Sequence, residues 1–387
     1  MRVAYIGDIV NHGYMLTTVG SSIIFLLSKQ QQVDSVDIFC PIKNAPGKLD
    51  ILPEKVGISH TYIYDDLFSL FKLVRENFSK YDKIIFNILP TGVGTSTLAN
   101  AFMMLLPIFV RIIGRKSKTA IIYHNSTYTN DLKVLGYNGF FNSLRKYVLR
   151  FIETFYFKHM DTFFLLKSYK DIIDELFPNN RVRAINVQYL EAYATVMLNK
   201  LDKSDIFTTK LPDKTIRILL HGFWGPQKDI EGALSMLSTL IDDGLLCRII
   251  ISGGVNRHFV EYENYFASVL HNFQNYIWEY KGYVQEEDMA SLLLETDLLL
   301  LPYKTPGGHS GVIEQAIFFE VPTIAMDFSE YREQSKNTEN IHLVSDIEQM
   351  AKTILSLVSE FGKTHERRIC VKDKLCTSVE NFSLLLS

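Results

Sequence analysis

Short apolar runs alternate with amphipathic segments along most of the chain. In its first half the apolar runs predict strands, and the segments between them show the residue spacing of helices. The predicted strands lie at residues 2–6, 36–39, 83–87, 119–123 and 161–166, and the predicted helices at 19–29, 67–78, 140–158 and 168–176. Strands that alternate with helices in this way favour a parallel sheet covered by helices.

A second series of the same kind follows a polar segment. Residues 201–214 contain Pro212 and show weak periodicity, which is typical of a linker. Strands are then predicted at 215–220, 246–251, 276–280, 297–301 and 322–325, and helices at 230–241, 260–273, 286–294 and 311–319. Because 387 residues are too many for one core, we expect an α/β protein with two Rossmann-like, doubly wound parallel sheets, in domains 1–205 and 212–360.

Composition narrows the function classes. The net charge of −3 gives no overall electrostatic basis for binding nucleic acid. The four cysteines (Cys40, Cys247, Cys370, Cys376) form no CxxC pair and no zinc spacing, so we expect reduced thiols in a cytoplasmic protein. Residues 1–7 read as a buried strand rather than a signal peptide. The longest apolar stretch, 98–110, is shorter than the roughly 18 residues of a membrane span.

Residues 298–316 carry the most informative pattern. An apolar run is followed by a loop containing Gly307, Gly308, His309, Ser310 and Gly311, and then by a helix with Glu314 in its first turns. The free N–H groups and positive dipole end of such a helix bind an anion, most simply a phosphate or diphosphate. Glu314 would then reach the hydroxyls of a ribose. The alternative is an ordinary βα turn that needs glycine for geometry alone.

Three more landmarks precede this loop in order. They are 221–229, which includes Gly222, Phe223 and Lys228; 252–254, which is Ser-Gly-Gly; and 281–284, which ends in Tyr283 and Val284. Together with the loop they resemble the nucleotide-sugar domain of retaining GT-B glycosyltransferases of group 1 (family 4-like), over residues 215–345. The resemblance implies that the N–H groups of Ser310 and Gly311 hold the diphosphate together with Lys228, that Glu314 holds the ribose, and that Tyr283 and Val284 lie near the base. Gly222 is a further donor-binding candidate, and the N–H groups of Gly307, Gly308 and His309 would contact the hydroxyls of the sugar.

Two departures from this family fall in the site. Phe223 stands where the family has an arginine, and Pro306 where it has its first glutamate. Lys228 is then the matched cation, whose catalytic role would be to neutralise charge on the leaving diphosphate. The alternative is a solvated lysine at a helix start. His309 replaces a glycine of the family, and it either donates to a phosphate or sugar oxygen or has no role.

The first domain offers weaker marks. The loop that contains Gly13 is not a dinucleotide fingerprint, but the resemblance implies that it faces the donor sugar and diphosphate. His124 follows a strand, and the resemblance makes it a catalytic candidate near the sugar or acceptor; the alternative is a satisfied edge residue. No strand-end Asp-x-Asp occurs, so we expect no metal site. The resemblance also implies that residues 361–387 form a C-terminal helix that crosses back to the first domain.

Two segments suggest contact with a membrane. Residues 98–118 end in basic side chains, and residues 140–158 mix aromatic with basic side chains. Such helices lie on anionic lipid surfaces. The alternative is a core helix under a solvated basic edge, and exposure of the aromatic side chains decides between the two.

These inferences predict a metal-independent hexosyltransferase at the inner face of the membrane. It would move a hexose, with retention, from a nucleotide diphosphate sugar to a hydroxyl of a glycan or lipid-linked glycan, and it would need no cofactor. Two alternatives are a nucleotide-sugar epimerase of the same fold and a non-catalytic nucleotide-sugar-binding assembly subunit. The sequence does not identify the base, the sugar, the acceptor or the oligomeric state.

Overall fold

The computed structural model divides into two compact units, Met1–Thr195 with Ser378–Ser387 and Val196–Thr377. It describes residues 1–7, 19–41, 54–62, 67–88, 97–113, 119–130, 142–185, 206–210, 215–256, 259, 261–284, 286–361, 366–370 and 386. Each unit is built on a parallel sheet, which confirms the expected α/β class. The N-terminal segment of the first unit ends at Thr195, whereas the first domain was predicted to end ten residues later, at residue 205.

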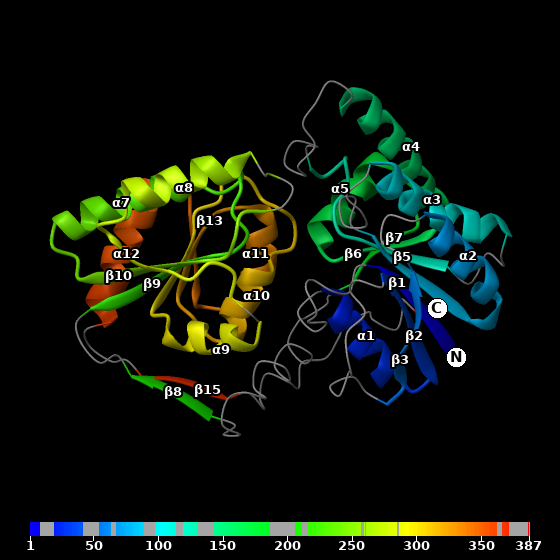
Figure 1. The fold of residues 1–387 in the computed structure, drawn as a ribbon, viewed down its shortest axis with the longest axis horizontal. Helices are drawn as coiled ribbons and strands as arrows, with labels where there is room; N and C mark the ends of the chain where they lie inside the picture. Colours follow the sequence, from blue (N-terminus) through cyan, green and yellow to red (C-terminus); the bar gives the residue numbers. More distant parts are fainter. Residues whose placement is uncertain are drawn as a thin grey trace. The chain divides into compact units, whose positions relative to one another are not determined.

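The first unit contains a seven-stranded sheet in the order β3-β2-β1-β4-β5-β6-β7 (Figure 1). Its strands are β1 (Arg2–Gly7), β2 (Ser35–Pro41), β3 (Val56–Tyr62), β4 (Lys83–Ile88), β5 (Thr119–Tyr123), β6 (Asp161–Phe164) and β7 (Val182–Ala184). Every neighbouring pair is parallel. The order reverses between β1 and β4, which is where ligands bind in doubly wound sheets.

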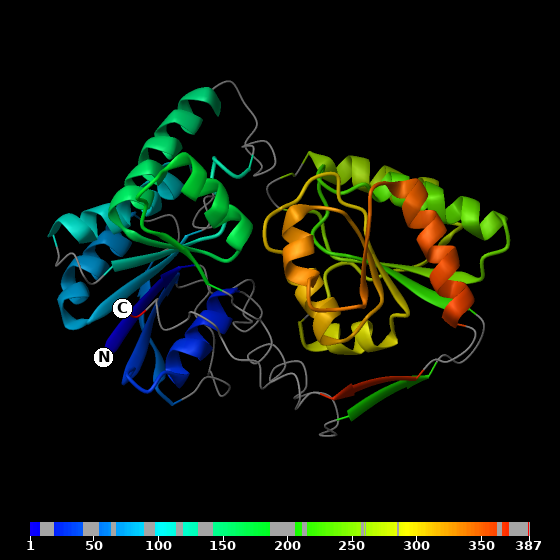
Figure 2. The same ribbon diagram turned by 180° about the vertical axis from the view of Figure 1, so that it is seen from behind.

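The helices of this unit cover both faces of its sheet (Figure 2). They are α1 (Val19–Lys29), α2 (Leu67–Asn77), α3 (Thr97–Ile113), α4 (Asn142–His159) and α5 (Lys167–Leu176), with a short 3-10 turn at Phe78–Lys80. Apolar residues of α3, α4 and α5 share one buried cluster with alternate residues of β4, β5 and β6. This alternation is the two-residue period of a strand that is buried on both faces.

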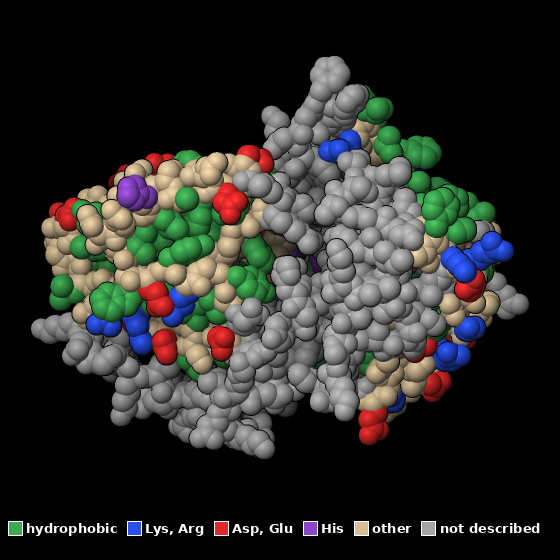
Figure 3. Space-filling model, viewed as in Figure 1, with side chains coloured by type: hydrophobic (Ala, Val, Ile, Leu, Met, Phe, Trp, Pro, Cys, Tyr) green, Lys and Arg blue, Asp and Glu red, His purple; other side chains and the backbone are tan. Residues whose placement is uncertain are grey.

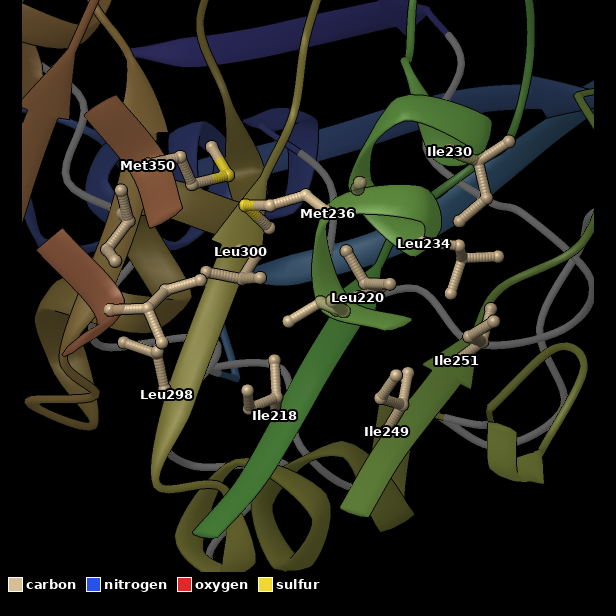
Figure 4. Close-up of a cluster of buried hydrophobic side chains, with 14 of the residues drawn as sticks. Ile218, Leu220, Ile230, Leu234, Met236, Ile249, Ile251, Leu298, Leu300 and Met350 are labelled. Atoms are coloured by element: carbon tan, nitrogen blue, oxygen red, sulfur yellow. The ribbon is translucent and has the colours of Figure 1, made fainter. Parts of the chain in front are cut away.

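The second unit contains a six-stranded parallel sheet in the order β11-β10-β9-β12-β13-β14. Its strands are β9 (Ile216–His221), β10 (Cys247–Ser252), β11 (Ile277–Tyr280), β12 (Leu298–Leu301), β13 (Thr323–Met326) and β14 (Ile341–Val344). Figure 4 shows how Ile218, Leu220, Leu298 and Leu300 project from neighbouring strands into one apolar layer against Leu234. The order reverses between β9 and β12, so the carboxyl ends of these strands frame the expected ligand position.

Six helices accompany this sheet among the described residues. They are α7 (Ile230–Asp242), α8 (Tyr262–Asn272), α9 (Glu286–Glu295), α10 (Gly311–Phe318), α11 (Ser329–Ser335) and α12 (Ile347–Phe361). Apolar side chains of α7, α8 and α12 pack into the same core as alternate strand residues, and α9 lies on the opposite face of the sheet from α7 and α8 (Figure 1).

A separate two-stranded antiparallel sheet corrects two expectations. Part of the predicted linker forms β8 (Ile206–Lys210), and the start of the predicted C-terminal helix forms β15 (Glu366–Cys370). The pairing joins segments far apart in sequence, so local periodicity gives no sign of it. The expectation of a helix from 361 is therefore wrong over 366–370, while α12 itself ends at Phe361. No helix among the described residues is long and apolar enough to cross a membrane.

Candidate active site

A cavity of about 380 Å³ opens in the second unit at the carboxyl ends of its central strands. His221 and Gly222 stand at the end of β9, Gly253 follows β10, and Tyr303 follows β12. Most of the residues predicted to bind the donor contribute to its wall, namely Gly222, Lys228, Tyr283, Val284, Gly307, Gly308, His309, Ser310 and Gly311. The four landmarks, which span about 90 residues of sequence, therefore meet at one site.

Lys228 is buried in the wall of this cavity, so the alternative of a solvated lysine is wrong. Its side chain is only 6% exposed, and Nζ lies 4.7 Å from the ring centre of Tyr303 and 5.3 Å from that of Trp224. Burial lowers the pKa of Lys228 to about 7. The ring faces of Trp224 and Tyr303 lie beside this ammonium. None of the described residues gives it a hydrogen bond or an ion pair. A cation held in this way is electrostatically unsatisfied until an anion enters.

The backbone around Lys228 is fixed from two sides. The N–H of Asp229 donates to the carbonyl of Pro302 at 2.6 Å, and the N–H of Lys304 donates to the carbonyl of Gln227 at 2.8 Å. Asp229 also caps α7, where its carboxylate accepts from the N–H of Gly232. The loop after β9 is thus tied to the loop after β12, which holds Lys228 at the carboxyl edge of the sheet.

Two glycines beside Lys228 have left-handed backbones. Gly222 has a φ of 129° and Gly253 a φ of 97°. A Cβ on Gly222 would collide with Nζ of Lys228, and a Cβ on Gly253 would collide with the carbonyl of Gly222. The positive φ favours glycine at both positions. At Gly253 the approach to the backbone of Gly222 also excludes a side chain, whereas at Gly222 the close atom is the flexible end of Lys228, which a side chain would displace.

His221 is a neutral neighbour of this cation. Its Nδ1 lies 2.7 Å from the hydroxyl of Ser252. Burial, and then the positive charge of Lys228, lower the pKa of His221 to about 3. His221 therefore carries no charge near neutral pH, and Lys228 supplies the positive charge at this end of the cavity.

The N-terminus of α10 forms the opposite wall. Ser310 caps the helix by accepting from the N–H of Ile313. The N–H of Ser310 donates to Oε1 of Gln334 at 2.9 Å. This amide is therefore already engaged in the structure, and its contact with a phosphate stays a prediction. The described residues offer no partner to the N–H groups of Gly311 and Val312. These two amides are the ones that the helix terminus presents to an anion.

Glu314 does not line the cavity. It is buried behind the loop, where Oε1 accepts from Nε2 of Gln334 at 3.0 Å and lies 3.3 Å from Nε2 of His309. Gln334 also donates to the carbonyl of Ser310 at 3.1 Å. In this structure Glu314 and Gln334 therefore position the 307–311 loop, and a contact of Glu314 with a ribose stays a prediction.

Two aromatic rings edge the cavity on the side of β11. Phe223 and Tyr283 stack with ring centres 6.2 Å apart and an interplanar angle of 27°. Both rings are exposed, at 46% and 37%. The position of the family arginine is therefore occupied by a ring that stacks on the predicted base-binding loop.

In the first unit, His124 follows β5 and its Nε2 lies 2.6 Å from Oδ1 of Asn87 in β4. Both residues stand at the carboxyl edge of that sheet. The next loop residues are anchored by Glu153 of α4, which is fully buried and accepts from the N–H and hydroxyl of Thr127 and from the hydroxyl of Tyr123. Gly13 lies outside the described residues.

Sequence patterns did not single out several residues of the site. Tyr303 and Tyr331 line the cavity, and Gln334 supports the loop. Tyr303 comes soon after the apolar run of β12, and this spacing indicates a position at the carboxyl edge of the sheet. Gln334 gave none, because it lies on α11, 20 residues beyond the glutamate that it contacts.

Comparison with known proteins gives this arrangement a family. Residues 215–360 match the family model described as Glycosyl transferases group 1. No curated protein matches the chain by sequence.

Solved structures share the fold of both units. Sucrose-phosphate synthase from Thermosynechococcus elongatus is 14% identical, with a TM-score of 0.62 over 93% of this chain and 90% of that one. HepE from Anabaena, in complex with UDP-glucose, is 13% identical, with a TM-score of 0.61 over 94% and 91%. WaaG, a glycosyltransferase involved in lipopolysaccharide biosynthesis, is 12% identical, with a TM-score of 0.57 over 99% and 97%. The chain has the GT-B fold, and its residues 215–360 match the family of group 1 glycosyl transferases.

Proposed function

We propose that the protein is a retaining glycosyltransferase that moves a hexose from a nucleotide diphosphate sugar to a hydroxyl of a glycan or lipid-linked glycan. The observation that carries this proposal is the buried ammonium of Lys228, which faces a cavity whose opposite wall is a helix N-terminus. Both features attract the same ligand chemistry, a diphosphate. The complex of HepE with UDP-glucose, a protein of the same fold, supports a nucleotide sugar as donor.

In the proposed reaction, the bond between the anomeric carbon and the diphosphate oxygen breaks. The bonding electron pair stays on the leaving diphosphate, and the acceptor oxygen forms the new bond on the same face of the sugar. The acceptor proton passes to the leaving phosphate oxygen. The charge that develops on this oxygen would be stabilised by Lys228 and by the N–H groups of Gly311 and Val312, and this stabilisation requires no protein nucleophile.

Charge compensation by protein groups is also what makes a metal-independent reaction chemically reasonable. In the described part of the chain, no three His, Cys, Asp or Glu side chains are grouped as a metal site would need. We propose that Lys228 takes the role of the cation. His124 stays a catalytic candidate on the strength of the resemblance, and the turnover of a His124→Asn variant tests it.

An epimerase of the same fold stays the alternative. It needs acid and base groups at the sugar, and the described residues that line this cavity include His309 and Lys228 but no aspartate or glutamate. Product analysis separates the two functions, since epimerisation proceeds without an acceptor.

A panel of radiolabelled UDP-, GDP- and ADP-sugars, offered together with a total lipid extract, tests the proposal. We expect transfer from one nucleotide class, and a fall in turnover of at least about 100-fold in Lys228→Met. Lys304→Met is the matched control, because Lys304 is an exposed lysine 3.1 Å from Asp229 in the next loop. Nucleotide binding without turnover in the unmodified protein would instead identify a non-catalytic subunit.

We also propose a cytoplasmic location at the inner face of a membrane. The isolated cysteines support the reducing compartment, and a lipid-linked acceptor would place the reaction at a bilayer.

A further inference from the structure

Helix α4 of the first unit presents an apolar stripe outward. Leu144, Tyr147, Val148 and Phe151 follow one another at helical spacing, and Tyr147 and Phe151 are each 76% exposed. The opposite side of the helix already supplies the buried residues Leu149, Ile152, Tyr156 and Phe157 to the core. The residues of the outer stripe therefore do not contribute to the core of the unit. Exposed aromatic stripes of this kind mark interaction surfaces.

The neighbouring helices continue the apolar surface. Phe109 and Ile112 of α3 and Phe68 of α2 are exposed, at 40%, 71% and 84%. Figure 3 shows hydrophobic side chains gathered over α4 and along the outer edge of this unit, with lysine and arginine side chains beside them. Phe109 also stacks edge-on with Phe71 of α2, so the two helices share this surface.

The charges that helix α4 itself exposes are of one sign. Helix α4 carries Arg145, Lys146, Arg150 and Lys158, and its one acidic residue, Glu153, is fully buried. Arg150 is held over the ring of Tyr128. The helix therefore exposes apolar and basic side chains but no carboxylate, and α3 adds Arg111 near its end.

We propose that the α4 surface, defined by Leu144, Tyr147, Val148 and Phe151 with Arg145 and Lys146, docks on an anionic phospholipid bilayer. The helix lies in the plane of the interface, with its aromatic rings among the headgroups and upper acyl chains and its basic groups at the lipid phosphates. This inference is independent of the proposed transferase activity.

Charge favours lipid over a second copy of the chain as the occupant. In a two-fold symmetric dimer the same patch would face itself. Lys146 would then meet basic groups of the other copy, and α4 offers no exposed carboxylate to pair with it. An anionic bilayer supplies both an apolar interior for the rings and phosphates for the cations.

Vesicle co-sedimentation tests the proposal. The full chain is mixed with phosphatidylcholine vesicles, with or without equimolar phosphatidylglycerol, and compared with a Tyr147→Ser, Phe151→Ser double variant. Trp278→Ser in the second unit is the control, since it removes an exposed ring (62%) from a different surface. We expect binding to the anionic vesicles that weakens with salt, a loss of at least about tenfold in the double variant, and no change in the control.

Three results would overturn the inference. They are no binding by the unmodified chain, equal binding by the double variant, or equal binding to neutral vesicles. A concentration-dependent dimer that the double variant abolishes, without vesicle binding, would assign the surface to self-association instead. Because both substituted residues are exposed, thermal unfolding of the variant should match that of the unmodified chain, and nucleotide binding by the second unit provides a separate readout.

Discussion

Gly222 and Lys228 lie against each other so closely that a methyl group on the glycine would collide with Nζ of the lysine. Gly222 also has a φ of 129°, where a side chain is strained whatever the space. The glycine is thus required both for the turn at the end of β9 and for the position of the cation. The backbone at Gly222 therefore determines the position of the positive charge of Lys228.

Replacing Gly222 with alanine should therefore displace the ammonium of Lys228. The backbone strain costs on the order of 1–3 kcal/mol, and the flexible end of Lys228 moves rather than the sheet. We expect the affinity for UDP, measured by calorimetry, to fall at least about tenfold because the charge–phosphate contact is lost.

A second alanine variant separates strain from displacement. Gly244 follows α7 with a φ of 103°, but a Cβ there meets nothing within 4 Å. Gly244→Ala should lose stability without losing UDP affinity. Equal losses of affinity in the two variants would show that the approach of Gly222 to Lys228 is irrelevant to binding.

The low pKa of Lys228 predicts pH-dependent nucleotide binding. In the free protein burial lowers this pKa to about 7 from the ordinary 10.5, and a bound diphosphate favours the charged form and raises it. Binding then takes up a proton above pH 7, so the affinity for UDP should fall as pH rises, by at most about tenfold per unit. His221 does not contribute, because its pKa is about 3.

Calorimetry in two buffers of different ionisation enthalpy counts the protons taken up. At pH 8 we expect close to one proton for the unmodified chain and for Lys304→Met, but none for Lys228→Met. An affinity that stays constant from pH 7 to pH 9 would contradict this assignment.

The sequence predicted the parts of the fold that depend on local patterns. Buried strands such as β12, with its four consecutive leucines, and helices such as α1 were placed closely because their periodicity is strong. Helix α3 was seen only as an apolar stretch. The strand β3 was missed because Gly57, Ser59 and His60 break its apolar run, and β7 because it has three residues.

The same limit applied to the site. Glycines and Lys228 could be placed from their spacing, and the structure brings them to one cavity. The engagement of the Ser310 N–H by Gln334 could not be foreseen, because it depends on how α11 packs beside α10. Partners that tertiary packing supplies have no fixed spacing in the sequence.

Phe223 offers a test of how charge is distributed in the cavity. Phe223→Arg puts a second cation beside Lys228, where the family has one, and removes a ring that is 46% exposed. We expect UDP to bind up to about tenfold more tightly at low salt, with a steeper loss as salt is added. Stability should change little, since the ring is only partly buried.

Phe223→Leu is the control for this gain. It removes the stacking on Tyr283 without adding charge, so it should not improve affinity. If arginine and leucine weaken UDP binding equally, the aromatic ring itself contacts the nucleotide, and the expected gain from charge is wrong.

The buried Lys83 predicts that the stability of the first unit depends on pH. It is 2% exposed at the start of β4, and no described residue gives its Nζ a hydrogen bond. Burial lowers its pKa below the ordinary 10.5, so between the two values the unfolded chain binds more protons, and the free energy of unfolding rises with pH.

Lys83→Met should therefore raise this free energy by about 1–3 kcal/mol at pH 7 and by less at pH 9, as measured by urea denaturation. Lys72→Met, on the exposed side of α2, should change it little at either pH. A destabilised Lys83→Met would mean that the ammonium has a stabilising role, whereas a gain independent of pH would mean that the lysine stays charged in the folded protein throughout this range.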